Sequence, residues 1–452
     1  MRAPSVLLLL LVSACAADKT PVDSADTGDT GDTAPPGPTR ERRAGRVSLA
    51  EADLVVTGEP GDGIGTSALV GSFGMAVGVS QREEGRGGLA VFGALPQADV
   101  GVAEAETWIE GATAQGYAGV TLAPLPGGGL ALGAFWDNRG GVQGGAVSLL
   151  PDVGQAPAAV LLGAEQDYVG ISIEPIGDDA LVIGAFGADW AEQDEGHALI
   201  VPAASTGEHM LDDVAVGGLY GEQRLGWLGV DVDAADLDGD GIDDLVAGAM
   251  GEEGRAPGSG VVYVVYGPVD ALRSTDDADA WILGEASLGQ AGKAVAAGGD
   301  VDGDGLGDVL IGAPNEDNAG NAYLLTATLQ GERELSLAQA TLEAEADWER
   351  GGFTVAFVGD QDGDDFGDVL VGASRHNDAA GDRAGAAYLL YGPLQGTRSL
   401  GQADWIAVGE GVDHRAGVAL GSLGDLDGDG FEELFIGATG FGEGAGAVYV
   451  WY

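Results

Sequence analysis

The sequence predicts an all-β fold, namely a seven-bladed β-propeller with four antiparallel strands in each blade, closed into a ring by a strand from the N-terminal end. Three observations predict it. An aspartate-rich segment recurs at a nearly even spacing, a short apolar strand containing a glycine follows each copy, and a spare strand precedes the first complete unit. Sequence periods of tens of residues are typical of repeat architectures, and four-stranded units placed around an axis leave only short, protected sheet edges.

The aspartate-rich segment occurs four times, and each copy places oxygen-bearing side chains at positions 1, 3, 5 and 9 of a tight loop. A backbone carbonyl would fill position 7. Calcium takes six to eight oxygen ligands, so alternating carboxylates on a curled loop predict about four structural calcium sites. The predicted ligands are Asp236, Asp238, Asp240, the carbonyl of Ile242 and Asp244 in the first loop; Asp300, Asp302, Asp304, the carbonyl of Leu306 and Asp308 in the second; Asp360, Asp362, Asp364, the carbonyl of Phe366 and Asp368 in the third; and Asp425, Asp427, Asp429, the carbonyl of Phe431 and Glu433 in the fourth.

Position 6 distinguishes the third loop from the other three. Glycine stands there in three copies, as a turn with positive φ prefers, but Asp365 stands there in the third copy. We therefore expect the third site to be the weakest. An EF-hand loop begins in the same way but needs a glutamate at position 12, where these loops have Ala247, Ile311, Val371 and Ile436. The loops are thus expected in β-hairpins, and a solvated acidic turn without metal is the alternative.

The number of blades follows from the glycine in the strand after each loop. The same strand pattern continues upstream into three units that have lost the aspartates, which gives seven units between residues 47 and 452. The chain ends on the third strand of the last unit, so residues 52–58 are expected to pair with residues 448–452 and close the ring. An open solenoid is the alternative, and it would leave an apolar edge unpaired. The glycines of the seven units are Gly78, Gly133, Gly184, Gly248, Gly312, Gly372 and Gly437.

The pattern D-x-D-G-D-G-x-x-D, followed by an apolar strand that ends in Gly-Ala, resembles the FG-GAP repeats that form the blades of the integrin α-subunit head. The resemblance covers nearly all of the chain after residue 46. The Gly-Ala-Pro triplet, however, is intact only at residues 312–314, and the first three blades lack the aspartates. The resemblance therefore implies calcium sites only in the blades from about residue 224 to 452, and partner binding on the opposite face of the ring.

That opposite face is expected to be built by the loops between second and third strands and by the linkers between blades. Aromatic and arginine side chains dominate binding hot spots, so such side chains in these loops are candidates for contact with a partner. The alternative for each residue is packing against a neighbouring blade. The candidates are Trp136, Arg139, Trp190, Tyr220, Trp348, Arg375 and His376.

The first residues predict export. The apolar run at residues 6–12 is too short to span a bilayer and is typical of a signal peptide. Residues 12–15, Val-Ser-Ala-Cys, resemble a bacterial lipobox, and Cys15 is the only cysteine in the chain. We expect a signal peptide at residues 1–14 and lipid attachment at Cys15 as the sole link to a membrane, with an ordinary secretory peptide as the alternative. By resemblance to sorted lipoproteins, Ala16 favours the outer membrane.

Residues 15–46 predict a disordered tether, because a segment rich in Asp, Thr, Gly and Pro cannot bury a core. Arg40, Arg42, Arg43 and Arg46 form a basic cluster near its end. We expect this cluster to be a solvated linker end, with contact to anionic lipid as the alternative.

Net charge narrows the set of partners. The chain has 73 acidic and 19 basic residues, a net charge of −54. Such a field argues against nucleic acid as a partner. Calcium that binds only the folded chain would stabilise it by mass action, so folding and calcium binding are expected to be linked.

The predicted function is non-enzymatic adhesion or recognition of a protein or glycan by a calcium-binding, lipid-anchored propeller of the cell envelope. A structural scaffold that faces the periplasm is the first alternative, and a hydrolase with a site on the propeller face is a remote one. His197, His209, His376 and His414 are the only histidines, and none lies near a serine or cysteine nucleophile signature. The clustered carboxylates are assigned to metal, which leaves little for acid–base or nucleophilic catalysis.

Overall fold

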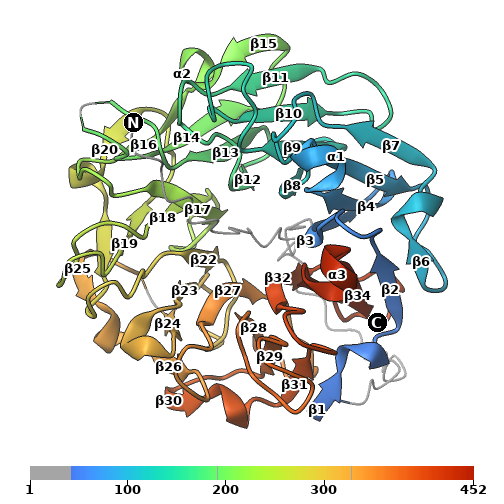
Figure 1. Ribbon diagram of the computed structural model, residues 1–452. Coiled ribbons are helices and arrows are strands. Elements are labelled where there is room, and N and C mark those ends of the chain that lie inside the picture. The colour runs from blue at the N-terminus through green and yellow to red at the C-terminus, as the bar shows by residue number, and fades with distance from the viewer. Residues whose placement is uncertain (1–41, 191, 327) are drawn as a thin grey trace, which may run out of the picture.

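The computed structural model describes residues 42–190, 192–326 and 328–452. Figure 1 shows seven sheets arranged in a ring, which the chain follows once around from its blue to its red end. The predicted all-β, seven-bladed propeller is confirmed. The signal peptide, Cys15 and the tether up to residue 41 lie outside the described residues, so those expectations remain predictions.

Blade 4 illustrates how each blade is built. Its first strand, β17 (Leu228–Ala235), lies nearest the axis of the ring, and β18 (Asp244–Ala249), β19 (Val261–Val265) and β21 (Ala280–Leu283) follow outward. Neighbouring strands are antiparallel. The loop between the first and second strands is therefore at one end of the blade, which we call the calcium-loop face. The loop between the second and third strands and the connector to the next blade are at the other end, which we call the partner face.

The remaining blades repeat this order. Blades 1 to 3 consist of β3 (Ile64–Gly71), β4 (Gly74–Val79), β5 (Gly88–Phe92) and β7 (Thr107–Glu110); β8 (Thr121–Pro124), β9 (Leu130–Ala134), β10 (Ala146–Leu150) and β11 (Ala159–Leu162); and β12 (Ile173–Ile176), β13 (Ala180–Ala185), β14 (His197–Pro202) and β16 (Gly217–Tyr220). Blades 5 to 7 consist of β22 (Ala294–Ala297), β23 (Val309–Ala313), β24 (Asn321–Leu325) and β26 (Ala340–Glu343); β27 (Gly351–Phe357), β28 (Val369–Ala373), β29 (Ala386–Leu390) and β31 (Trp405–Val408); and β32 (Ala416–Ser422), β33 (Leu434–Ala438), β34 (Ala447–Trp451) and β2 (Leu54–Thr57).

Six of the seven sheets carry a fifth, outermost strand that the sequence did not predict. In blade 4 it is β25 (Gly331–Glu334), which pairs in parallel with β21 and comes from the segment that leads to the outer strand of blade 5. Each such strand therefore joins a blade to its neighbour by backbone hydrogen bonds. The others are β15 (Gly207–Met210), β20 (Leu272–Ser274), β30 (Gly396–Ser399), β1 (Gly45–Ser48) and β6 (Val100–Gly101) on blades 2, 3, 5, 6 and 7.

Helices in the described part of the chain are single turns in loops. Three are α-helical, α1 (Arg82–Gly85), α2 (Leu211–Val214) and α3 (Phe441–Gly444). The 3₁₀ turns are η1 (Leu49–Glu51), η2 (Val102–Glu104), η3 (Thr275–Asp277), η4 (Glu316–Asn318), η5 (Leu335–Leu337) and η6 (Leu400–Gln402). No helix among the described residues has both the length and the apolar character needed to cross a membrane.

The ring closes as predicted. Strand β2 pairs with the C-terminal strand β34 in antiparallel register, with Leu54 opposite Val450 and Thr57 opposite Ala447. The N-terminal segment also contributes β1, which pairs in parallel with β31 of blade 6. Two strands from one end of the chain thus hold two different blades, and the folded ring begins at least as early as Gly45.

The expectation of a solvated linker end for the arginine cluster is wrong for its described members. Arg43 donates to the backbone carbonyl of Tyr452 over 2.8 Å, and Arg46 pairs with Glu345 over 2.7 Å. The physical reason is the acidic surface of the ring, which offers carboxylates and carbonyls to any nearby guanidinium. Arg40 lies outside the described residues.

The glycine that repeats in each second strand has a steric role. Gly248 lies against Gly292 of the next inner strand, where a Cβ atom on Gly248 would sit 2.0 Å from the Gly292 carbonyl oxygen. Gly292 itself has a φ of +78°, which favours glycine. Backbones of adjacent blades therefore touch directly near the axis, and apolar side chains such as Val246, Val264 and Ile311 fill the space between sheets farther out.

Buried charges also join blades 4 and 5. Asp231 on β17 accepts hydrogen bonds from the Val295 backbone N–H over 2.9 Å and the Ser172 hydroxyl over 3.0 Å. The ammonium of Lys293, which is 1 % exposed, lies 4.5 Å from the ring centroid of Phe353. Burial raises the pKa of Asp231 and lowers that of Lys293, while their opposite charges favour ionisation of both.

Replacement of Asp231 by alanine is expected to lower the free energy of unfolding by about 3–5 kcal/mol, because Lys293 would lose its buried counter-charge. Urea unfolding followed by circular dichroism measures this change. The double variant Asp231→Asn/Lys293→Met, in which neither side chain is charged, should lose less stability than Asp231→Ala alone. Equal losses in the two variants would show that packing, not charge, is what Asp231 contributes.

Candidate metal centre and partner face

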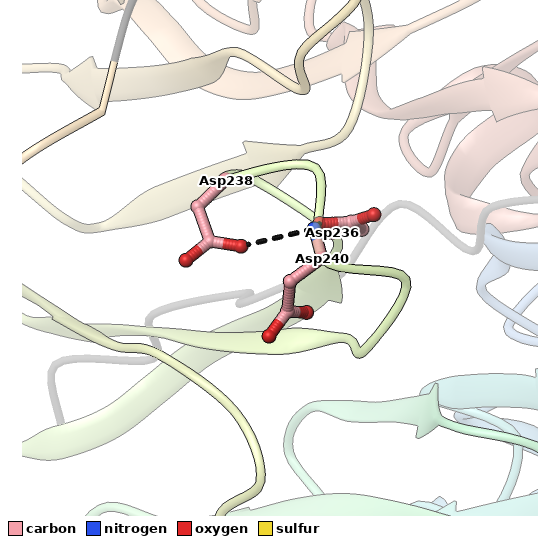
Figure 2. A group of neighbouring side chains, drawn as sticks. All are labelled: Asp236, Asp238 and Asp240. Atoms are coloured by element: carbon pink, nitrogen blue, oxygen red, sulfur yellow. Dashed lines mark hydrogen bonds between the residues drawn. The ribbon is translucent and has the colours of Figure 1, made fainter.

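The four acidic loops have the same geometry. In each loop, carboxylate oxygens of the residues at positions 1, 3 and 5 lie within 4.8 Å of one another. Figure 2 shows this group, Asp236, Asp238 and Asp240, in the loop between β17 and β18. Two ligands of one calcium ion can be no more than about 5 Å apart, since each lies about 2.3–2.6 Å from it. The three carboxylates of every loop can therefore reach one ion, and this donor set suits calcium.

The position-1 aspartate shapes the loop. Asp236 Oδ1 accepts from the Gly239 N–H over 2.7 Å, and its Oδ2 accepts from the Gly241 N–H over 2.9 Å. Short polar side chains stabilise turns in this way. The other position-1 residues, Asp300, Asp360 and Asp425, accept from the backbone N–H three residues later over the same 2.7 Å. The position-1 aspartate of each loop thus stabilises the turn of that loop.

The position-9 carboxylate lies outside the group of three and is buried at the base of the loop. Asp244 Oδ2 accepts from the Leu237 N–H over 2.8 Å, and its Oδ1 accepts from the Gly267 N–H over 2.7 Å. Each oxygen keeps a second lone pair that a cation could use, so the residue remains a candidate ligand. The equivalent Asp308, Asp368 and Glu433 accept from the second residue of their loops in the same way.

Burial, together with the charges of the other loop carboxylates, raises the pKa of Asp244 to about 6 and those of Asp308 and Asp368 to about 7. Backbone N–H groups oppose this shift. A divalent cation would oppose it as well, because positive charge favours the ionised form. At position 7, the backbone N–H of Ile242 donates to the Asp240 carboxylate. The predicted ligation by its carbonyl, and by those of Leu306, Phe366 and Phe431, remains a prediction.

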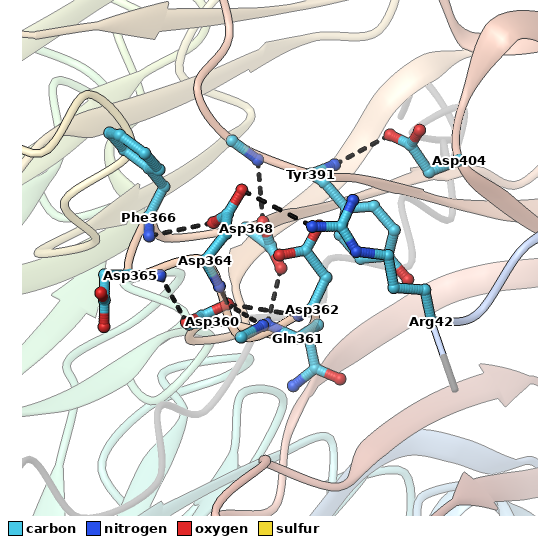
Figure 3. Close-up of polar contacts among 12 residues, drawn as sticks. Arg42, Asp360, Gln361, Asp362, Asp364, Asp365, Phe366, Asp368, Tyr391 and Asp404 are labelled. Atoms are coloured by element: carbon cyan, nitrogen blue, oxygen red, sulfur yellow. Dashed lines mark hydrogen bonds and ion pairs between the residues drawn. The ribbon is translucent and has the colours of Figure 1, made fainter. Parts of the chain in front are cut away.

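The third loop differs in two ways. Asp365 adopts a φ of +70° at the position where the other loops have glycine. In addition, the guanidinium of Arg42 lies 2.8 Å from Asp362 and 3.9 Å from Asp364, so a positive charge from the N-terminal segment stands beside this carboxylate group (Figure 3). Arg42 also lies 5.7 Å from the ring centroid of Tyr391. These contacts give a second reason to expect the weakest calcium binding here.

Replacement of Arg42 by glutamine is expected to strengthen calcium binding at the third loop about two- to fivefold, the range that corresponds to one exposed ion pair. Terbium luminescence or calorimetric titration of the full chain would measure the change. Arg398→Gln is the matched control, because Arg398 pairs with Asp404, which is not one of the predicted loop ligands. An unchanged or weaker affinity in the Arg42 variant would contradict the expected competition between arginine and calcium.

Consecutive acidic loops touch one another. The Gly367 N–H in the third loop donates to the Asp300 carbonyl in the second over 2.6 Å. The side chains of Leu306 and Phe366 lie against the position-4 glycine of the preceding loop, where a Cβ atom would meet them at 2.9 and 2.7 Å. The loops thus form a continuous arc on the calcium-loop face of blades 4 to 7.

The partner-face candidates fall into two groups. Trp190 is 60 % exposed and stacks on Tyr220, and Trp348 is 67 % exposed. Arg375 is also exposed. The other three are held by neighbours: Trp136 packs edge-on against Tyr117, Arg139 pairs with Asp137 over 3.0 Å, and the buried His376 lies 3.0 Å from a Glu349 oxygen. Sequence position alone did not separate the two groups.

Buried glutamates beneath the partner face give stability a pH dependence. Burial raises the pKa values of Glu252 and Glu316 to about 7. Glu252 accepts from the Tyr263 hydroxyl, and Glu316 accepts from the Ala286 N–H over 3.0 Å. Because the folded state holds the neutral acid more readily than the unfolded chain does, this contribution to stability is complete below about pH 4 and is lost as pH rises through about 7.

Glu252→Gln is therefore expected to reduce the fall in the thermal midpoint between pH 5 and pH 8, measured at a fixed concentration of chelator. The neutral amide has no proton to lose in this range. Glu253→Gln, a change at the exposed neighbouring residue, serves as the control and should leave the slope unchanged. A wild-type midpoint that rises steadily from pH 5 to pH 8 in chelator would contradict the assigned direction.

Comparison with known proteins agrees with this geometry. The FG-GAP repeat model matches residues 228–265, 291–325 and 416–451, which lie in blades 4, 5 and 7. The chain is 27 % identical to integrin alpha pat-2 of Caenorhabditis elegans over 237 residues, and 39 % identical to integrin alpha-5 of Xenopus laevis over 99 residues. These matches cover 48 % and 21 % of this chain and 18 % and 9 % of those relatives.

A third relative is the phosphatidylinositol-glycan-specific phospholipase D of Dictyostelium discoideum, 27 % identical over 226 residues, which cover 43 % of this chain and 23 % of that protein. The chain thus spans less than a quarter of each of these three relatives. The predicted resemblance to FG-GAP repeats and integrin α propellers is confirmed. The third acidic loop lies outside the segments that match the repeat model.

Proposed function

We propose that this chain, three of whose blades match the FG-GAP repeat, is a calcium-stabilised propeller that recognises a protein or glycan partner in adhesion or recognition at the cell envelope. The observation that carries the proposal is the arc of four equivalent acidic loops on one face of the ring. Those loops supply carboxylates for structural calcium, and the opposite face remains available for a partner. Integrin α relatives support adhesion or recognition as the class of function.

Lipid attachment at Cys15 completes the proposal and would place the propeller at the bacterial outer membrane. Metabolic labelling with an azide or alkyne fatty acid tests it, with Cys15→Ser as the matched variant. Wild-type chain is expected to take up label and to fractionate with membranes, and the variant is expected to lose both properties. Label on the variant, or unlabelled wild type, would refute attachment at Cys15.

The function is proposed as non-enzymatic. In the described part of the chain, the histidines contact carboxylate, aromatic or backbone groups rather than a serine or cysteine. His376 is placed between Glu349 and Tyr388, His209 contacts the Thr206 carbonyl, and His414 packs on Phe441. When bound, calcium would supply charge neutralisation and rigidity to the loops. The chain's own carboxylates would hold it and orient the hairpins around it.

A binding screen tests the proposed function. The full calcium-loaded chain would be presented to a glycan array and to envelope proteins, with the same chain in chelator as the control. At least one ligand is expected to bind in calcium and to bind more weakly in chelator. Absence of any ligand, combined with a thermal midpoint that does not respond to calcium, would refute the proposal.

A further inference from the structure

Four arginine residues lie in neighbouring segments on the partner face of blade 6. Arg350 and Arg415 end the connectors that lead into β27 and β32, and Arg375 and Arg383 lie in the loop between β28 and β29. Backbone hydrogen bonds join these three segments. The Arg375 N–H donates to the Glu349 carbonyl over 3.1 Å, and the Arg415 N–H donates to the Arg383 carbonyl over 3.1 Å. We call these four residues the arginine group.

Three members of the arginine group have no acidic partner among the described residues. Arg383 pairs with Asp413 over 2.7 Å, but no carboxylate of the described residues lies within 4.0 Å of the guanidinium of Arg350, Arg375 or Arg415. Arg350 instead lies 5.8 Å from the ring centroid of Phe353. Burial and the charges of Arg375 and Arg415 lower the pKa of Arg350 to about 10. The group is therefore a concentration of repelling positive charge.

This grouping is unusual for the chain in which it occurs. With 73 acidic and 19 basic residues in the sequence, an arginine on this ring readily finds a carboxylate, as Arg46 and Arg255 do. Holding several guanidinium groups together without such partners costs free energy, which an anionic ligand would offset. The arginine group thus has the charge and donor chemistry of an anion-binding surface.

We propose that the arginine group binds an acidic polysaccharide, with uronate carboxylates or sulfate groups held by the guanidinium forks. The proposal rests on the proposed function, because it names the ligand of the partner face. Planar guanidinium groups bind carboxylate and sulfate oxygens in a bidentate manner. Trp348, which is 67 % exposed and two residues before Arg350, offers a flat apolar surface against which a sugar ring can pack.

A polysaccharide fits the surrounding charge better than an acidic protein does. At physiological ionic strength, charges are screened over about 8 Å, so a slender chain lying along the arginine group meets mainly the local positive charge. A globular acidic protein would cover a wider area and face the negative charge of the rest of the ring, which is −54 over the whole chain. An acidic protein segment is therefore an outcome of the test and not the proposal.

Binding measurements on the full chain in calcium test the assignment. The probes are heparin as a sulfated chain, polygalacturonate as a uronate chain, dextran as a neutral chain and polyglutamate as a protein polyanion. At least one of the two acidic polysaccharides is expected to bind, with an affinity that falls as salt is raised from 50 to 200 mM, whereas dextran should not bind. Arg375→Gln and Arg415→Gln are each expected to weaken binding at least tenfold.

Matched variants separate this site from general effects. Arg224→Gln changes an arginine in the connector before blade 4, also on the partner face, and should leave affinity unchanged. Trp348→Ala should weaken polysaccharide binding and leave any binding of polyglutamate unaffected. Each variant must keep the wild-type thermal midpoint in calcium, and Arg375 is exposed, so its variant is expected to fold.

Three results would overturn the assignment: no binding of either acidic polysaccharide, equal binding by the wild type and the Arg375 and Arg415 variants, or equally tight binding of polyglutamate. The first two leave the proposed function intact if another ligand from the screen binds in calcium. The third would assign the arginine group to an acidic protein segment. Failure of the proposed function would be recognised separately. The thermal midpoint would then not respond to calcium, and no ligand in the screen would bind.

Discussion

Removal of calcium is expected to lower the thermal midpoint of this chain by about 10 °C or more. A ligand present at a hundredfold excess over its Kd stabilises the folded state by about 2.7 kcal/mol per site, so four sites supply about 11 kcal/mol. Unfolding entropy of about 2.1 cal/mol/K per residue gives about 0.85 kcal/mol/K for a ring of some 400 residues. The ratio of these two quantities sets the expected shift.

The structure explains why the loss would be large. Each loop holds three carboxylates within 4.8 Å of one another, and without a cation these charges repel one another. Contact between loops spreads the effect, because the Gly367 N–H bonds to the Asp300 carbonyl and Phe366 rests on Gly303. An empty second loop would therefore weaken the support of its neighbours, and loss of one ion is expected to reduce affinity at the next.

Scanning calorimetry of the full chain in 10 mM calcium and in chelator measures the shift, at a calcium concentration of about 100 Kd for sites with a Kd of about 10⁻⁴ M. Asp302→Asn should remove part of the response. Asp179→Asn is the control, since it alters the corresponding hairpin of blade 3, which lacks the ligand pattern. A midpoint that is the same in calcium and in chelator would show that the loops are acidic turns without a structural ion.

Most of the fold could be predicted because short segments of the sequence carry its steric requirements. A second-strand glycine such as Gly248 must meet the backbone of the next blade, and this requirement repeats with the blade. Strand β2 was also recognisable from its own short, apolar sequence. The fifth strands were missed because segments such as β25 and β30, with sequences GERE and GTRS, are short and polar and lack the apolar pattern of the other strands.

The candidate sites show the same contrast between features set by local sequence and features that depend on distant segments. Ligands at positions 1, 3 and 5 lie within one short loop, so their convergence follows from local spacing. Arg42, by contrast, reaches Asp362 across more than three hundred residues of sequence, and the arginine group draws on three separate segments. The group could have been found from the equivalent positions of Arg350 and Arg415. Each lies two residues before a glycine, Gly352 or Gly417, that is the second residue of an inner strand.

Strand β2 contributes buried apolar side chains to the closure of the ring. Leu54 and Val56 of β2 are 1 % and 0 % exposed, and they pack with Val448 and Val450 of β34 in one cluster. Burying a side chain of this size contributes about 1.5–3 kcal/mol. Without β2, the apolar strand β34 would become an unpaired sheet edge, which is prone to aggregation.

Deletion of residues 42–58 together with everything before them is therefore expected to abolish cooperative unfolding and to produce aggregates, because β1 and β2 are both lost. Val56→Asp should have a similar but smaller effect, a loss of about 4 kcal/mol or more, since it places a charge at a fully buried position. Thr57→Ser is the matched control in the same strand.

Size-exclusion chromatography measures aggregation, and calorimetry measures the cooperativity of unfolding. A synthetic peptide of residues 42–58 should restore the monomeric ring. A truncated chain that stays monomeric and unfolds at the wild-type temperature would show that the seven sheets remain closed without the N-terminal strands, and that interblade packing alone holds the ring.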